Sequence, residues 1–567
     1  MSDAPGEHLL ERIARRAAER GDDPAVQFFE PAAAAPSVLT WSALDLLARR
    51  ARSGFEQRGL RPGDRVLLLL PTGPHYLGLL LGAFQAGLVP STMRVFGGDG
   101  DGAASRHELA GLVDALAPRL VVATSPMGGG AADCVHPDGL LGAAPTDRPM
   151  AIAGPDATAY IQFTSGSTGR PRGIALTWRA ILANVAAIAQ RTALTPQDRA
   201  VSWLPMYHDM GLFGGLLTAL HVGAVITLMD TSAFMSGPLT WLRLMHDVRA
   251  TITVTPPSAL QTCLQMLARR PGAYDLSSLE QVICGAEPLS QRFVRDVCGA
   301  LGPYGLRPTA LRPVYGLAEA TLAVTFSPRE RAPRIDSVDC VRFEADGVAV
   351  PASAGDVHAR TWVSAGTPVA GTVVRIVGEG GGEGGVEGGY EDLPDRHVGR
   401  VLIQTPSLFA GHVEAGRFTA REGAWFDTGD LGYRADGELY VTGRRKDLII
   451  KNGRNFSPDR IEELACLVDG VRRAVAFGLH DDARATEQIV VLAEVRARDA
   501  ATAAARDDLR LRIRRELGVA GYPVDTVSFV DRGSLPLTTS GKVRRQLCRD
   551  LYAQGLGTSG RDKSPAG

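Results

Sequence analysis

The sequence predicts an α/β protein: a large N-terminal domain with parallel βα sheets and a β-rich subdomain, followed by a small, mobile α+β domain. Two observations lead to this prediction. Strand-like apolar runs alternate with helical patterns through the first half of the chain, which is typical of parallel sheets flanked by helices. Short strands and then a separate mixed unit follow after residue 363. At 567 residues the chain is also too long for one hydrophobic core.

The alternation begins close to the N-terminus. Apolar residues recur at helical spacing over 42–59, Pro62-Gly63-Asp64 turns the chain into a strand over 66–70, and a second helix covers 76–87. We expect a further helix over 178–190. Further strands are expected over 120–123, 159–163, 224–229, 250–254 and 281–284. Ligands of such sheets bind at the carboxyl ends of the strands.

The second half of the chain is less regular. The segment 327–363 is rich in Pro, Arg, Asp and Ala, and 378–389 is almost pure Gly and Glu, which favours a flexible surface hairpin. We expect the N-terminal domain to cover 1–442 and the C-terminal domain 443–556, with a disordered tail over 557–567. Further strands are expected over 372–377, 399–404, 438–442, 473–478, 488–495 and 526–530, and helices over 459–468 and 500–517.

Composition excludes several classes of function. The net charge is −1 and there is no basic tail, so the chain as a whole does not attract nucleic acid or anionic membranes. No apolar run is long enough for a membrane span, and the charged N-terminus has no signal core, so a cytoplasmic protein is expected. The seven cysteines are scattered, which favours reduced thiols over a zinc site.

The stretch Phe163-Thr164-Ser165-Gly166-Ser167-Thr168-Gly169-Arg170-Pro171-Arg172-Gly173 has the composition of an ATP-binding loop. Its glycines let backbone N–H groups approach phosphate oxygens, its hydroxyls add donors, and Arg172 adds a fixed charge. It matches neither the P-loop nor the Gly-x-Gly-x-x-Gly pattern. The alternative is a Ser/Gly-rich surface linker. We expect the loop to lie between a strand and the helix over 178–190.

Other short motifs follow the loop along the chain. They are Trp203-Leu-Pro-Met-Tyr-His208-Asp-Met-Gly211, Gly285-Ala286-Glu287-Pro288, Tyr315-Gly316-Leu317-Ala318-Glu319, Thr428-Gly429-Asp430, Gly443-Arg444-Arg445-Lys446-Asp447 and Thr538-Thr-Ser540-Gly541-Lys542. In this order the motifs resemble the adenylate-forming superfamily of acyl-CoA synthetases, adenylation domains and luciferases. The resemblance covers the chain from about Ser42 to Tyr552.

Within that superfamily the chain resembles fatty acyl-AMP ligases most. The runs Tyr207-His208-Asp209-Met210-Gly211-Leu212, Glu319-Ala320-Thr321-Leu322 and Gly453-Arg454-Asn455 are typical of them, and 327–363 lies where that group carries an insertion. The implied reaction is ATP-dependent activation of a fatty acid to acyl-adenylate, with release of pyrophosphate. The acyl group then passes to the phosphopantetheine thiol of an acyl carrier protein.

Other functions stay open. An acyl-CoA or aryl-CoA synthetase would use free coenzyme A instead, and an amino-acid-adenylating enzyme would pair a buried carboxylate such as Asp209 with the substrate ammonium. A silent nucleotide-binding scaffold is a third class, but it would lack the equivalents of Glu319 and Lys542, and both are present. The acid, its chain length, the pathway product and the oligomeric state cannot be inferred from the sequence.

The resemblance also implies roles for single residues. Glu319 would hold Mg²⁺, a hard cation that favours carboxylate and phosphate oxygens. Asp430 would accept hydrogen bonds from the ribose hydroxyls. Tyr315 and Gly316 would lie against the adenine, with the backbone of Gly285, Ala286 and Glu287 along the base. The site would therefore bind ATP with Mg²⁺.

The catalytic cations are the remaining assignments. Lys542 would bridge the substrate carboxylate and the α-phosphate, and it stands out because the chain has only three other lysines, among them Lys446, the implied hinge between the domains. Arg444 would reach the ribose or phosphate. His208 would lie near the substrate carboxylate. The runs 210–220 and 222–229 are apolar enough to line an acyl tunnel, and they are equally consistent with core. Arg172 stands where many relatives have lysine.

Overall fold

The computed structural model describes residues 7–31, 33, 35–95, 103–125, 133–164, 171–353, 356, 359–378, 391–452, 454–481, 484, 486–496, 502–536 and 543–555. The side chains of 103–106 and 164 are outside this description. The same holds for the loop residues 165–170, the Gly/Glu-rich stretch 379–390, the motif 538–542 and the expected tail 557–567. No helix within the described ranges is both long and apolar enough to cross a membrane.

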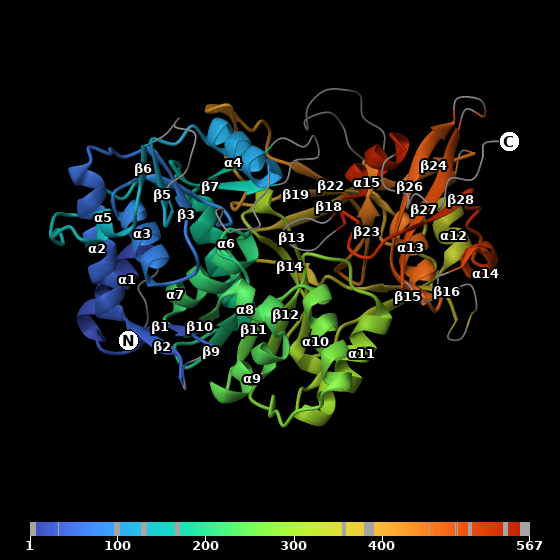
Figure 1. The fold of residues 1–567 in the computed structure, drawn as a ribbon, viewed down its shortest axis with the longest axis horizontal. Helices are drawn as coiled ribbons and strands as arrows, with labels where there is room; N and C mark the ends of the chain where they lie inside the picture. The colour runs from blue at the N-terminus through green and yellow to red at the C-terminus, as the bar shows by residue number, and fades with distance from the viewer. Residues whose placement is uncertain are drawn as a thin grey trace.

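A nine-stranded sheet lies at the centre of the large domain (Figure 1). Its order is β17-β14-β13-β12-β11-β9-β10-β1-β2, and the strands from β13 to β1 run parallel. Several strands are buried along their whole length, as expected for a sheet covered by helices. The strands are β1 (Pro24–Phe29), β2 (Ser37–Thr40), β9 (Arg199–Ser202), β10 (Val225–Met229), β11 (Ile252–Thr255), β12 (Gln281–Cys284), β13 (Leu311–Gly316), β14 (Ala323–Phe326) and β17 (Thr367–Pro368).

Helices from two parts of the chain cover this sheet. In Figure 1, α9, α10 and α11 lie along the lower edge of the large domain with α8 beside β11, and α6 and α7 lie higher, toward the N-terminal helices. One element is a π-helix, η1, which is a rare form often found at functional sites. The elements are α1 (Leu9–Glu19), α6 (Trp178–Thr192), η1 (Met210–Leu217), α7 (Thr218–Val222), α8 (Thr231–Ser236), α9 (Leu239–Asp247), α10 (Pro257–Arg269), α11 (Gln291–Leu301), η2 (Gly302–Tyr304) and η3 (Pro308–Ala310).

A second parallel sheet, ordered β4-β3-β5-β6, confirms the βα pattern expected near the N-terminus. α2 and α3 pack closely against each other beside it. This approach is possible because Gly78 and Gly82 of α3 have no β-carbon, which would clash with α2. The elements are α2 (Trp41–Gln57), β3 (Arg65–Leu69), α3 (Pro74–Gln85), β4 (Val89–Thr92), α4 (Ala103–Leu116), β5 (Leu120–Ala123), β6 (Asp133–Val135) and α5 (Asp138–Leu141).

The structure corrects the expected setting of the Ser/Gly-rich loop. The loop does not connect a strand to a helix: β7 (Thr158–Thr164) and β8 (Arg172–Thr177) flank it as an antiparallel pair, and α6 begins only after β8. These strands belong to a sheet ordered β21-β20-β8-β7, completed by β20 (Gly411–Glu414) and β21 (Arg417–Ala420). The short run Arg172–Thr177 lacks a turn before the helix, so the sequence pattern merged it with the loop.

The β-rich region forms an antiparallel sheet ordered β18-β19-β22-β23. Its strands are β18 (Val373–Val377), β19 (Gly399–Gln404), β22 (Phe426–Ala435) and β23 (Glu438–Arg444). β23 continues beyond the expected end, because Arg444 still pairs with Asp430 of β22. Gly443 and Arg444 are therefore part of this sheet.

The segment 327–363 contains a compact unit of its own: β15 (Ile335–Asp339), α12 (Cys340–Asp346) and β16 (Ala359–Val363). Asp336 fastens it to the β-rich sheet by accepting hydrogen bonds from Tyr433 Oη at 2.7 Å and Arg396 Nη1 at 3.1 Å. On its other side it touches the C-terminal domain (Figure 1). There Glu344 accepts a hydrogen bond from Tyr522 Oη at 2.7 Å and lies 3.7 Å from Arg454 Nη2.

The C-terminal domain has the mixed α+β composition that the sequence predicts. Three strands, ordered β26-β27-β28, carry α13 and α14 over an apolar core. The elements are η5 (Arg445–Asp447), β24 (Ile449–Lys451), β25 (Arg454–Phe456), α13 (Pro458–Leu467), β26 (Val471–Asp481), β27 (Thr486–Val495), α14 (Ala503–Val519), β28 (Thr526–Val530) and α15 (Arg545–Ala553). Together with the large domain, these elements confirm the predicted fold class.

Arg545 ties three parts of the small domain together. Its guanidinium lies 2.7 Å from Asp447 of η5, 2.6 Å from Asp459 and 2.9 Å from Glu462 of α13. These carboxylates outweigh the effect of burial and raise the pKa of Arg545, which is therefore charged at any pH at which the protein is folded. Asp447, the last residue of η5, is consequently fastened to the C-terminal domain.

Arg545→Met should loosen the C-terminal domain by about 3 kcal/mol, because removing one partner of a buried ion network leaves the carboxylates uncompensated. Faster hydrogen–deuterium exchange of α13 and β26 amides would measure the loss, with Arg515→Met as control, since Arg515 is exposed on α14. Equal exchange in both variants would contradict the role assigned to Arg545.

Candidate active site

A buried carboxylate, Asp430, is shared by two strands of different sheets. Tyr315 Oη of β13 donates to Asp430 Oδ2 at 2.6 Å, and Arg444 Nε of β23 lies 3.2 Å from Oδ1. Asp430 is only 6% exposed. Burial and the neighbouring carboxylate raise the pKa of Tyr315 well above its usual value, so the phenol keeps its proton and acts as donor. Three sequence-predicted residues are thus in direct contact.

The backbone before Asp430 forms a tight turn. Gly429 has φ +73°, a conformation that favours glycine, and a β-carbon there would meet no atom within 4 Å. Thr428 Oγ1 accepts a hydrogen bond from Asp430 N at 3.1 Å, and Asp427 Oδ1 accepts one from Gly429 N at 3.0 Å. The turn at the Thr-Gly-Asp motif therefore fixes the position of the Asp430 backbone, from which the carboxylate extends.

Glu319 lies on a short 3₁₀ turn, η4 (Ala318–Ala320), between β13 and β14. Burial raises the pKa of its carboxyl above the usual range. Arg444 and Arg172 act in the opposite direction and Asp430 in the same one, so these charges are close enough to influence each other. Four predicted residues from separate parts of the sequence thus surround one space.

The donor set around Glu319 fits a nucleotide-bound Mg²⁺ ion. Among the described residues, no group of three or more His, Cys, Asp or Glu could hold a metal without help. Mg²⁺ in nucleotide sites binds through one or two carboxylates plus phosphate oxygens, and a single half-buried glutamate offers that arrangement. Glu319 is also a carboxylate whose burial a cation would offset.

Arg172 is the charged residue of the loop region whose position the structure describes. The other predicted loop residues fall outside the described ranges: Ser165, Gly166, Ser167, Thr168, Gly169 and the side chain of Thr164. It stands at the start of β8, where its Nε lies 2.5 Å from Glu414 Oε1 of β20. Both side chains are more than half exposed. Arg172 is thus held on the Glu319 side of the site by a weak surface pair.

The Gly-Ala-Glu-Pro motif follows β12 and lies against β13. A β-carbon on Gly285 would come within 2.6 Å of Val314 Cγ2, so only glycine allows this approach. Ala286 follows with φ +69°. The carboxylate of Glu287 is occupied elsewhere, because Ser258 N and Oγ donate to it at 2.9 Å at the start of α10. Ala286 lines the cavity described next, whereas the Glu287 carboxylate is engaged by Ser258.

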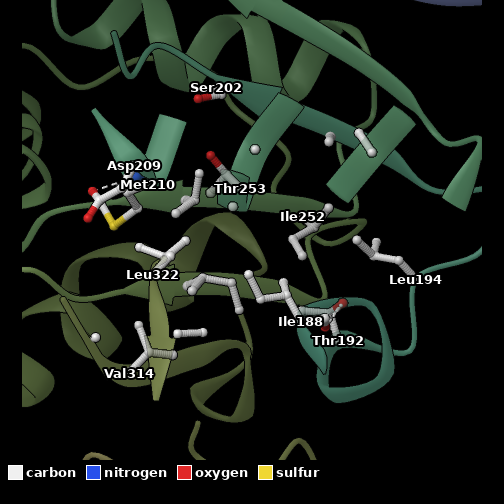
Figure 2. A pocket seen from close by; sticks show the side chains of 18 of the residues that line it. Ile188, Thr192, Leu194, Ser202, Asp209, Met210, Ile252, Thr253, Val314 and Leu322 are labelled. Carbon is white, nitrogen blue, oxygen red and sulfur yellow. Dashed lines mark hydrogen bonds between the residues drawn. The ribbon is translucent and has the colours of Figure 1, made fainter. Parts of the chain in front are cut away.

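An apolar cavity opens next to these motifs. Its empty space, including the part open to solvent, is about 840 Å³. Figure 2 shows Asp209 and Met210 at one end, Val314 and Leu322 along one side, and Ile188, Thr192 and Leu194 at the other end. Its lining comprises Ile188, Thr192, Leu194, Ala200, Val201, Ser202, Asp209, Met210, Gly214, Gly215, Ala219, Ile226, Ile252, Thr253, Val254, Ile283, Ala286, Val314, Tyr315, Gly316, Leu322, Ala323 and Phe326.

The cavity joins the predicted nucleotide motifs to the predicted acyl run. Ala286, Tyr315 and Gly316 lie in its wall, and so do Met210, Gly214, Gly215 and Ala219 from η1 and α7. Other residues of the run, such as Leu212, Phe213 and Leu217, are ordinary core. The expectation of a lining therefore holds for one face of η1 and α7 and for Ile226 of β10, whereas other residues of the run are core.

His208 lies just before the N-terminus of η1. Its ring is 4.9 Å from the Tyr207 ring, and its carbonyl accepts hydrogen bonds from Gly211 N and Leu212 N. The adjacent Asp209 lines the cavity and accepts a hydrogen bond from Met210 N at 2.7 Å. Lys446 is exposed on η5, and Lys542 falls outside the described residues.

Sequence patterns missed several residues that shape this site. Asn184 of α6 and Thr321 hold the backbone beside Glu319, while Glu344 and Arg545 control the two faces of the C-terminal domain. Only Thr321 stood within a recognised run, Glu319-Ala320-Thr321-Leu322, and that run gave it no role of its own. The others contact residues far away in the sequence, so no local pattern marks them.

Comparisons with known proteins agree with this site. Residues 13–413 match the model of the family described as AMP-binding enzyme, and residues 460–542 match AMP-binding enzyme C-terminal domain. A putative acyl-CoA synthetase of Caulobacter vibrioides is 32% identical over 514 residues, covering 88% of this chain and 87% of the relative. The long-chain-fatty-acid--AMP ligase FadD26 of Mycobacterium bovis is 32% identical over 547 residues, covering 91% of each.

A solved structure from structural and functional studies of fatty acyl-adenylate ligases from E. coli and L. pneumophila shares the fold. It has a TM-score of 0.86 and 29% sequence identity, over 98% of this chain and 99% of that chain. The superfamily resemblance of the motifs is therefore confirmed, and the chain belongs to the AMP-binding enzyme family of adenylate-forming enzymes.

Proposed function

We propose that this enzyme activates a fatty acid with ATP to give acyl-adenylate and pyrophosphate, and then transfers the acyl group to the phosphopantetheine thiol of an acyl carrier protein. One observation carries the proposal: an apolar cavity is lined by Ala286, Tyr315 and Gly316, and Tyr315 also donates to Asp430, the partner of Arg444. A lipid-like tail in the cavity would bring its carboxylate to the nucleotide motifs. The similarity to fatty-acid--AMP ligases supports this choice of substrate.

In the first step a carboxylate oxygen of the acid bonds to the α-phosphorus of ATP, and the bond to the β-phosphate oxygen breaks, so that pyrophosphate leaves with the electron pair. Two anions must approach, so the residues around them supply positive charge. We assign this role to Lys542, Arg444 and Arg172, with Thr164 to Gly169 as backbone and hydroxyl donors. Mg²⁺ held by Glu319 would neutralise the leaving phosphates.

The nucleoside is assigned to the groups that already hold Asp430. Tyr315 and Gly316 lie where adenine would pack, with the backbone of Gly285 to Glu287 along its edge. Asp430 would accept hydrogen bonds from the ribose hydroxyls through the lone pairs that Tyr315 and Arg444 do not use. His208, next to the cavity-lining Asp209, would orient the acid carboxylate. These assignments are proposals drawn from geometry and motif position.

The acyl-transfer step needs the small domain to move, and the structure suggests where. Arg444 is fastened to the large domain through β22, whereas Asp447 is fastened to the C-terminal domain through Arg545. Only Arg445 and Lys446 lie between these two anchors. We therefore place the hinge at this pair, with Lys446 as the residue whose backbone turns.

The choice of acceptor is assigned to the segment 327–363. Its Glu344 holds Tyr522 and Arg454 of the small domain, and its Arg360 lies near Ser457 Oγ at 3.5 Å. These contacts restrain the swing of that domain. A carrier protein can offset the restraint with its own binding surface, whereas free coenzyme A cannot. The similarity to a putative acyl-CoA synthetase keeps coenzyme A as the alternative acceptor.

Pyrophosphate release across a panel of acids tests the first step. Fatty acids should drive release, aryl and amino acids should not, and Lys542→Ala should lower kcat by at least about 100-fold while ATP still binds, because the lysine contact is made in the transition state. Lys563→Ala, in the tail, is the control. Normal pyrophosphate release by Lys542→Ala would contradict the catalytic role assigned to Lys542.

Gly215→Phe should shorten the acids that the cavity accepts. A β-carbon there meets only Ser202, Ile226 and Met210 at 3.7 to 3.8 Å, so the ring can extend into the cavity. We expect kcat/KM to fall about tenfold or more for hexadecanoic acid and to change little for octanoic acid, since each displaced methylene loses about 0.8 kcal/mol. Gly299→Phe, at an exposed site on α11, is the control. Equal losses for both acids would exclude this cavity as the acyl site.

Glu344→Ala should make coenzyme A a better acceptor. Losing its contacts with Tyr522 and Arg454 removes a restraint worth about 1.5 kcal/mol, equivalent to roughly tenfold in rate. The measurement is thioester formation from preformed acyl-adenylate with coenzyme A and with a pantetheinylated carrier protein. Asp346→Ala, which breaks only a pair within α12, is the control. Rapid coenzyme A use by the wild type would instead favour the synthetase alternative.

A further inference from the structure

The backbone directly after Glu319 contains an unusual turn. Thr321 has φ +65° and ψ −53°, and Leu322 N donates to Ala320 O at 2.8 Å. This is the γ-turn with positive φ, the rarer and more strained of the two forms. A β-branched residue is especially unfavourable there, and Thr321 is fully buried. Strain of this kind persists only where the surroundings enforce it, and it concentrates at functional sites.

Two side chains enforce the turn. Thr321 Oγ1 donates to Ser407 O at 2.9 Å. Asn184 of α6, which is also fully buried, donates to Ala320 O at 3.2 Å and Ala323 O at 2.9 Å, and it accepts from Ala323 N at 3.0 Å. The amide of Asn184 thus closes over the turn from one side, and the threonine hydroxyl fastens it from the other.

The backbone of the same turn is held on every side. Leu317 N donates to Leu322 O at 2.9 Å, and Phe409 N donates to Glu319 O at 2.8 Å. A β-carbon on Gly316 would lie 1.9 Å from Leu322 O, so the two strands approach as closely as a glycine permits. The path from Gly316 to Ala323 therefore has a single conformation.

The turn separates two groups with different tasks. Glu319, two residues before Thr321, lies on η4, directly after the strand that carries Tyr315, and the charges of Arg444 and Arg172 act on its carboxyl. Leu322, one residue after it, lies in the cavity wall next to Val314 (Figure 2). A normal turn at Thr321 would point one of them elsewhere, because the strained φ is what reverses the chain between them.

We propose that Thr321 is a positioning residue, clamped by Asn184 and by the carbonyl of Ser407, that aims Glu319 at the Mg²⁺–ATP site and Leu322 into the acyl cavity. The inference rests on the proposed nucleotide site and extends it. It assigns to Thr321 no contact with substrate. Its action is to remove the alternative conformations in which the carboxylate would point away.

Equilibrium binding of Mg²⁺–ATP tests the clamp without relying on turnover. Thr321→Ser keeps the hydroxyl and should bind like the wild type. Thr321→Val keeps shape and strain but loses the bond to Ser407, and Thr321→Gly loses both the bond and the strain. Both should bind Mg²⁺–ATP about tenfold more weakly, the usual size of an effect on a residue that orients a ligand. The melting temperature of each ligand-free protein is measured in parallel.

The pattern across variants distinguishes positioning from folding. We expect Thr321→Gly to melt close to Thr321→Ser, because relief of strain offsets the lost bond, and yet to bind Mg²⁺–ATP as weakly as Thr321→Val. Equal affinity in all variants, or weaker binding that only follows a lower melting temperature, would overturn the proposal. If the wild type releases no pyrophosphate with any fatty acid, the proposed function fails, and the binding series still decides the role of Thr321.

Discussion

Asp430 is the point on which the two halves of the large domain depend. Its carboxylate lies on the β-rich sheet and accepts a hydrogen bond from the phenol of Tyr315, which lies on the central nine-stranded sheet. Arg444, from the neighbouring strand, balances its charge. A buried carboxylate without such partners would be strongly unfavourable, so the sheets are held in register by the need to satisfy it. The nucleotide motifs inherit their relative positions from this contact.

A buried arginine lies in the sheet that forms one wall of the cavity. Ile283 and Val314 line it, and by strand register Arg312 lies on the same face of the central sheet, next to Ile283. Arg312 donates to Gln281 and to the carbonyls of Arg191 and Ser327. Burial lowers its pKa to about 10, so it stays charged at neutral pH. The apolar wall at Ile283 and Val314 is therefore backed within the sheet by a charged residue whose guanidinium is hydrogen-bonded to the protein, although Arg312 itself does not line the cavity.

Much of the fold was accessible from the sequence because its signals are local. Buried strands such as Gln281–Cys284 and Thr526–Val530 begin and end where their apolar runs do. The setting of the Ser/Gly-rich loop was wrong because β8 has no turn after it, and the strand pairing that reveals it involves β20, more than two hundred residues further on.

The same limit applies to the candidate site. Tyr315, Asp430 and Arg444 came from motifs, and the structure brings them together. Their supports did not come from motifs: Asn184 reaches the turn at Ala320 across 136 residues, and Glu344 meets Tyr522 across 178. Residues that carry the chemistry occur in short, recognisable sequence motifs. Residues that hold them in place are selected by packing, which no short motif encodes.

The anchoring of η5 by Arg545 also decides how this enzyme can be recombined with its relatives. Asp447, Asp459 and Glu462 share one guanidinium, so all four residues must come from the same parent. The Arg444–Asp430 pair sets the same condition on the other side. A chimera joined between Arg445 and Lys446 keeps both ion networks intact. A junction only a few residues later would divide the second network and bury unmatched charge.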